Sequence, residues 1–99
     1  MTTQERAKLR SLSNNLRDLV FLGKEGLTDN VIMQINDNLY AHELIKIKAQ
    51  KNIPESINDL ANKICDECKC ELVAVIGSKI LVYKQTDKPK FNHLLGYRK

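Results

Sequence analysis

The stretch from residue 19 to residue 30 constrains the fold of this chain most, because a strand, a tight turn and a helix follow one another directly. The apolar run Leu19–Leu22 is typical of a buried strand, and Gly23 ends it. Thr28 is a good N-cap for a helix, and Asp29 suits the positive end of the helix dipole. The sequence therefore predicts a strand–turn–helix unit here, whose helix lasts to about residue 41.

Two further helices are indicated by capping residues and by apolar residues at helical spacing. Thr2 and Glu5 match a capping box, and the leucines that follow predict a helix from about Thr3 to Leu16. Pro54 suits the first turn of a helix, since its missing N–H would be unpaired there in any case. Apolar residues at helical spacing then extend this last helix to about residue 69.

Three further strands complete the predicted order, which is α-β-α-β-α-β-β. Leu44–Ala49 alternates with a period of two, which is typical of a half-exposed strand. Residues 71–76 and 79–83 are rich in strand-forming side chains, and the Gly77-Ser78 pair between them favours a type II′ hairpin turn. Because strands alternate with helices, crossover connections are needed. We therefore expect one α/β domain with a mixed four-stranded sheet packed with three helices.

The positive charge of the chain is unevenly distributed. The net charge is +4, yet residues 1–83 hold eleven basic and eleven acidic side chains, which cancel. The excess lies from Lys84 to Lys99, which hold five basic residues against one acidic residue. We therefore expect a domain over residues 1–84 and a basic tail over residues 85–99. The tail is either mobile or docked onto the domain through Phe91, Leu94 and Leu95. A basic balance favours an anionic partner, nucleic acid first.

The sequence contains no segment typical of a membrane span or a signal peptide. No apolar run approaches the roughly 20 residues of a membrane span. The first six residues are polar and no apolar stretch follows them, so they do not resemble a signal peptide. We therefore expect a cytoplasmic protein that has no membrane partner.

The three cysteines do not form a recognisable metal or redox site. Cys65 and Cys68 form a CxxC pair with Cys70 nearby, but a structural zinc site usually needs four ligands. The only imidazoles, His42 and His93, are distant in sequence. A redox CxxC sits at a helix start, whereas this one falls at a predicted helix end. We expect reduced thiols, no metal and no cofactor.

The glycine pair of the turn at residues 23–26 suggests a nucleic-acid contact. Glycines have no side chain and adopt positive φ, which lets a backbone come close to a partner. In KH modules a GxxG loop clamps nucleotide backbone. A plain tight turn between strand and helix is the alternative, because glycine is the commonest residue of turns.

Four motifs together resemble a known family, the CRM domain, and within it the small, free-standing bacterial YhbY-like proteins. The resemblance runs from about Glu5 to Lys84, with the motifs in the family's order and spacing. They are the residues 9–12 (LRSL), 20–32 (VFLGKEGLTDNVI), 42–48 (HELIKIK) and 71–77 (ELVAVIG).

The resemblance implies a fold like that of the C-terminal domain of bacterial translation initiation factor three. It also implies RNA binding and association with precursors of the large ribosomal subunit. The family's GxxG loop maps onto Gly23, Lys24, Glu25 and Gly26. Glu25 departs from the family, in which this position is usually neutral or basic, and a carboxylate there should weaken phosphate binding.

Basic side chains near these motifs are further candidates for RNA binding. Arg10, Lys46 and Lys48 fall inside matched motifs, and Arg17 lies close to them. Solvated surface charge is the alternative for all four, since lysine and arginine are mostly exposed.

The sequence shows no combination of catalytic residues, so the expected function is that of a non-catalytic, monomeric RNA-binding protein. In this reading it assists assembly of the large ribosomal subunit and binds ribosomal RNA or pre-large-subunit particles. The alternative is a protein-interaction module that binds a ribosomal protein or an assembly GTPase, with a GxxG loop that is only structural.

Overall fold

The chain forms three helices and four strands in the predicted order, as seen in a computed structural model that describes residues 1–96. Tyr97, Arg98 and Lys99 of the expected tail lie outside the described residues. Within residues 1–96 no helix is both long and apolar enough to cross a bilayer. The elements are α1 (Thr3–Ser13), β1 (Asp18–Leu22), α2 (Asp29–His42), β2 (Leu44–Ala49), α3 (Ile57–Cys68), β3 (Glu71–Ile76) and β4 (Lys79–Tyr83).

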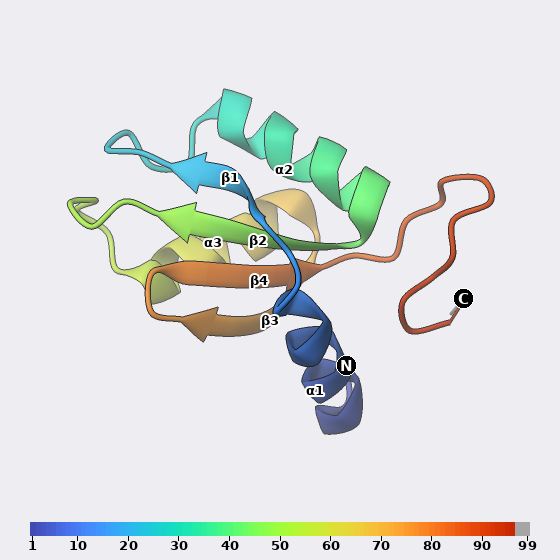
Figure 1. Cartoon of the computed structure of the whole chain (residues 1–99). Helices are drawn as coiled ribbons and strands as arrows, with labels where there is room; N and C mark the ends of the chain where they lie inside the picture. Colours follow the sequence, from blue (N-terminus) through green and yellow to red (C-terminus); the bar gives the residue numbers. More distant parts are fainter. Residues whose placement is uncertain (97–99) are drawn as a thin grey trace.

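The four strands form one mixed sheet in the order β1-β2-β4-β3 (Figure 1). β1 runs parallel to β2, while β4 is antiparallel to both of its neighbours. The predicted class, a mixed four-stranded sheet with three helices, is confirmed. β1, β2 and β3 therefore end at one edge of the molecule, where the loop at residues 23–28 and the β3–β4 turn also lie (Figure 1).

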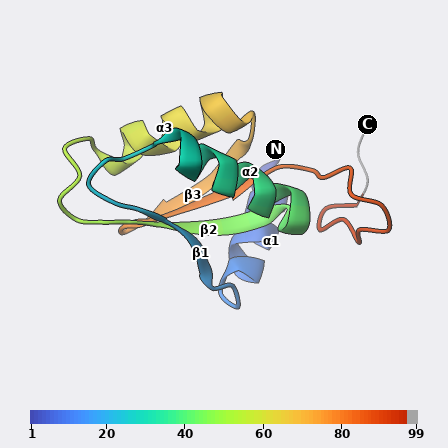
Figure 2. The same cartoon turned by 90° about the horizontal axis from the view of Figure 1, so that it is seen from above.

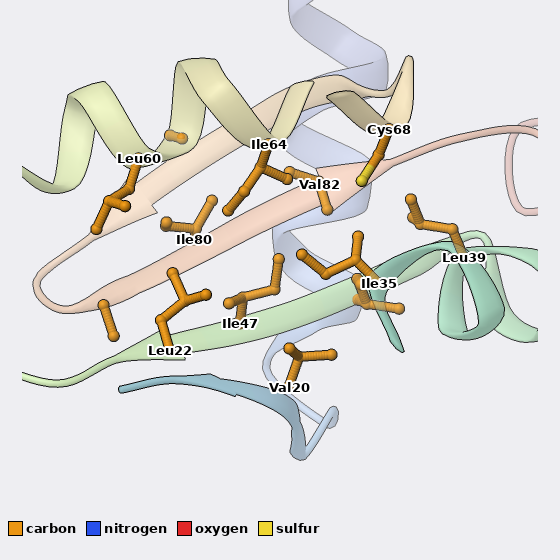
Figure 3. Packing of buried hydrophobic residues seen from close by; sticks show 13 residues of the cluster. Val20, Leu22, Ile35, Leu39, Ile47, Leu60, Ile64, Cys68, Ile80 and Val82 are labelled. Atoms are coloured by element: carbon orange, nitrogen blue, oxygen red, sulfur yellow. The ribbon is translucent and has the colours of Figure 1, made fainter. Parts of the chain in front are cut away.

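Helices α2 and α3 cover one face of the sheet, called the inner face here, and α1 lies on the opposite, outer face (Figure 2). The inner-face core joins side chains from both helices and all the central strands, and Figure 3 shows how they meet. Its fully buried members include Val20, Ile35, Ile47, Ile64 and Ile80.

The outer-face core is smaller and lies at one end of the sheet only. It consists of Leu9, Leu44, Val73, Leu81 and Tyr83, all buried. Because Leu44 begins β2 and Tyr83 ends β4, α1 covers the end of the sheet that is farthest from the loop at residues 23–28 (Figure 1). Among residues 1–96, no helix lies over the other half of the outer face.

Helix starts follow the predicted caps, with one exception. The capping box of Thr2 and Glu5 is present, and the Thr28 hydroxyl accepts from the Val31 N–H at 3.3 Å. The third helix, however, begins at Ile57, so the prediction that Pro54 lies in its first turn is wrong. Ser56 is the N-cap, and its hydroxyl accepts from the Asp59 N–H at 3.1 Å. The helix therefore starts three residues after Pro54.

The first helix is shorter than predicted, because it ends at Ser13 and not at Leu16. The Asn15 and Leu16 N–H groups donate to the carbonyls three residues before them, which closes tight turns instead of helical ones. Leu16 still packs against the outer-face core. The spacing of Leu16 therefore predicted its contact with the core correctly, although Leu16 itself lies outside the helix.

The tail is docked onto the domain over its described part, through the buried carboxylate of Glu43. This residue follows α2 with φ +65° and is fully buried. Its Oε2 accepts from the Thr86 N–H at 2.9 Å and lies 2.6 Å from His93 Nδ1, and its Oε1 accepts from the Leu94 N–H at 3.0 Å. Leu94 and Leu95 pack against the outer-face core. Of the two expected states of the tail, the structure shows the docked one.

Candidate nucleic-acid interface

The GxxG segment forms a closed turn between β1 and α2. The Gly26 N–H donates to the Gly23 carbonyl at 2.9 Å, and Gly26 adopts φ +70°. Residues that carry a side chain rarely adopt this backbone conformation, so the turn requires glycine at this position. Lys24 and Glu25 stand exposed at the tip, one carrying positive and the other negative charge.

The two glycines of the turn differ in what surrounds them. Gly23 is exposed, and a Cβ placed on it would meet Gln50 at an ordinary contact distance of 3.8 Å. Gly26 is buried, and a Cβ there would lie 3.5 Å from a carboxylate oxygen of Glu55. Glu55 is itself paired with Lys63. Gly23 is therefore the open side of the turn, toward which another molecule could approach.

Lys46 and Lys48 lie on the outer face of β2, as the alternation of this strand predicted. Lys48 is exposed and stands beside Phe21 of β1 in the strand register. Lys46 is half-buried, and its ammonium donates to the Leu16 carbonyl at 3.3 Å. Lys48 is the nearer of the two to the GxxG turn. Lys48, unlike Lys46, lines a hollow of about 290 Å³ that is also bordered by Phe21, Gly23 and Gln50.

Arg10 and Arg17 are not brought to the turn. Both are exposed, but Arg17 precedes β1 whereas Gly23 follows it. At a strand rise of ~3.3 Å per residue, the two residues are separated by roughly 20 Å. Arg10 lies on the last turn of α1, over the same distant end of the sheet. An RNA segment that reached all the candidate residues would have to extend along the whole outer face.

Two side chains of β1 are exposed although the sequence predicted them to be buried. The run Leu19–Leu22 was expected to be a buried strand, but only Val20 and Leu22 are buried. Phe21 is 62% exposed and Leu19 39%, because β1 is an edge strand and no helix of the described chain covers this part of its outer face. The period of two along a strand could have indicated this, since Phe21 stands between two inward residues.

The three thiols lie at the end of α3 and in the turn that follows it, on the far side of the sheet from the outer face. All are free. A hydrogen bond from the Cys70 thiol lowers the pKa of Cys65 and raises that of Cys70, while burial raises the pKa of Cys68. Within residues 1–96, no three histidine, cysteine or acidic side chains are grouped to hold a metal ion.

The chain is similar to a protein family and to several known proteins that agree with one another. A sequence model of the CRS1/YhbY (CRM) domain matches residues 1–84. The chain is 36% identical to the probable RNA-binding protein YqeI of Bacillus subtilis, over 91% of this chain and 94% of the relative. It is 32% identical to an RNA-binding protein of Haemophilus influenzae, over 91% of each chain.

A solved structure is similar as well. The solution structure of the protein SAV1595 from Staphylococcus aureus, for which RNA binding has been put forward, superposes with a TM-score of 0.77. The two sequences are 36% identical, and the match covers 91% of this chain and 94% of the other.

Proposed function

Because this chain belongs to the CRS1/YhbY (CRM) domain family, we propose that it is a non-catalytic RNA-binding protein of the cytoplasm. Its target in this proposal is ribosomal RNA within precursors of the large ribosomal subunit, whose assembly it assists as a monomer. The names of its relatives in Bacillus subtilis and Haemophilus influenzae, which describe RNA-binding proteins, support the RNA part of the proposal.

The observation that carries the proposal is the closed glycine turn at the end of β1. Gly23 offers an exposed backbone with no side chain, so a phosphate can approach it closely. Lys24 adds a positive charge at the tip, and the N-terminus of α2 follows two residues after the turn, where the helix dipole favours an anion. Contacts of this kind position an RNA and recognise its shape, without reading its sequence.

The basic side chains extend the contact beyond the turn. Lys48 lies beside the hollow that ends at Gly23, and Lys46 follows on the same face of β2. Arg10 and Arg17 are exposed at the far end of the sheet. In this proposal they bind phosphates of the same RNA at a distance from the turn.

A charge placed on the turn tests the proposal. Gly23→Asp adds a carboxylate where phosphate must approach, in a position that accepts a Cβ without a clash. We expect weaker binding to fragments of large-subunit ribosomal RNA in a protein that unfolds at the wild-type temperature. Asn62→Asp, which adds the same charge on the exposed side of α3, is the matched control and should bind as the wild type does.

Fractionation of cell extract tests the assembly role. We expect the protein to migrate in a sucrose gradient with free large-subunit particles and to be released from them by Gly23→Asp. If the variant stays bound to the particles and binds isolated RNA as well as the wild type, the turn is only structural. The protein would then act as an interaction module for a protein partner.

A further inference from the structure

The half of the outer face that α1 leaves uncovered presents an aromatic ring among basic side chains. Phe21 comes from β1, Lys48 from β2 and Lys79 from β4, which are consecutive strands of the sheet. Ile76, 42% exposed, follows on β3. Figure 1 looks onto this face, whose uncovered half adjoins the loop at residues 23–28. We call these four residues the outer patch.

Phe21 is the aromatic member of the outer patch and lies on β1, an edge strand of the sheet. Its side chain is 62% exposed, the largest exposed fraction among the big apolar side chains of the described chain. A strand neighbour lies ~4.8 Å away, and in this register that neighbour is Lys48. A ring with one face open to solvent and a cation beside it has the composition of a site where bases stack and phosphates pair.

The two lysines of the outer patch repel each other, which lowers the stability of the free protein. Lys48 and Lys79 stand directly opposite each other across β2 and β4, and like charges in that arrangement destabilise a sheet. Asp18 relieves this in part, because its carboxylate lies 3.4 Å from the Lys79 ammonium. No ion pair of Lys48 occurs among the residues that the structure describes. With Lys46 on the same face, the balance stays positive and favours an anionic ligand.

The outer patch is continuous with the glycine turn. The hollow of about 290 Å³ begins at Phe21 and Lys48 and reaches Gly23 and Gln50. A nucleotide whose phosphate met the backbone at Gly23 would therefore have its neighbour over the Phe21 ring. This geometry favours RNA over an apolar protein segment, since a protein partner would need the lysines neutralised by acidic side chains.

We propose that the outer patch binds unpaired nucleotides of an RNA strand, with one base stacked on Phe21 and the flanking phosphates at Lys48 and Lys79. The inference rests on the proposed function and adds to it the kind of RNA recognised, because a base inside a duplex has no free face to stack on Phe21. A double helix would meet the glycine turn alone, whereas a loop, bulge or single strand would meet both.

Tryptophan substitution gives a direct measurement, since the chain contains no Trp. Phe21→Trp should bind an oligouridylate of about ten nucleotides, a typical length for such a strand site, and its fluorescence should be quenched as bases stack. Phe21→Ala should weaken binding of the same probe by about fivefold or more, the usual loss for one stacked base. Phe21→Tyr keeps a ring and should bind as the wild type does.

Tyr40→Ala is the matched control, because Tyr40 is an exposed aromatic (49%) on α2, away from the outer face. It should leave the affinity unchanged. A probe whose bases are replaced by abasic sites keeps the phosphates and removes stacking. On this probe the wild type and Phe21→Ala should bind equally.

The outcomes separate the two proposals. A wild-type protein that binds neither the oligouridylate nor ribosomal RNA overturns the proposed function. Wild-type binding that Phe21→Ala leaves intact overturns the outer patch alone, and so does an unquenched Trp at that position. If Phe21→Ala changes only the sedimentation of the free protein, the patch is a contact between copies of the chain, and the inference is likewise wrong.

Discussion

Replacing Glu43 with Gln should loosen the tail and lower the free energy of unfolding. One oxygen of the buried carboxylate accepts from the Thr86 N–H and the other from the Leu94 N–H. The Gln amide has the same shape but only one acceptor oxygen. Whichever way the amide is turned, one of these two backbone N–H groups therefore faces a donor.

The size of the effect follows from that lost acceptor. A buried donor without an acceptor costs about 1–3 kcal/mol. In a domain of this size each kcal/mol lowers Tm by roughly 4–8 °C, so we expect a fall of about 4 °C or more. A domain of this length is stable by about 5–15 kcal/mol, and the variant should therefore remain folded.

Two measurements report the loss separately. Thermal unfolding followed by circular dichroism gives the change in Tm, and limited digestion with trypsin at Lys90 reports how often the tail opens. Glu67→Gln is the control, because this carboxylate is exposed and surface changes stay within about 0.5 kcal/mol. If Glu43→Gln matches the control in both measurements, the three contacts of Glu43 do not hold the tail.

The other predictions concern the loop, the tail and the thiols. Glu25→Lys should tighten RNA binding at low salt, by about 1 kcal/mol or less because the position is exposed and screened; equal affinity would mean that phosphate does not come near it. Lys88→Gln with Lys90→Gln keeps the tail docked but removes charge, so it should flatten the slope of log affinity against log salt; unchanged slopes would mean that this part of the tail does not touch RNA. Cys65 should be alkylated by iodoacetamide at a lower pH than Cys68, because its pKa is lowered and that of Cys68 is raised by burial; mass spectrometry of the peptides would show the order, and the reverse order would refute it.

Elements whose ends depend on their own residues were predictable from the sequence. The alternation in β2 gave its bounds to the residue, and the hairpin around Gly77 was predicted with its strands. Gly77 has φ +59°, as the first central residue of a type II′ turn requires. The position of the glycine turn between β1 and α2 was predicted in the same way, while its contact with RNA stays a prediction.

Features that depend on distant partners could not be read from local patterns. β4 pairs with β2 as well as with β3, although α3 and β3 lie between β2 and β4 in the chain. The burial of Glu43 is one such feature, since glutamate is almost never fully buried unless it is paired. Its partners lie 43 to 51 residues along the chain, so no spacing near it could have revealed them.

The small outer-face core has a consequence for how the molecule opens. Leu9 is the only apolar side chain that α1 buries fully, while the inner-face core is much larger. Proteins open in units whose free energies differ according to such contacts. Amide hydrogens of α1 should therefore exchange with solvent well before those of β2 and β4. Leu94 and Leu95 pack against the same core as Leu9, so the two ends of the chain, far apart in sequence, should loosen as one cooperative unit.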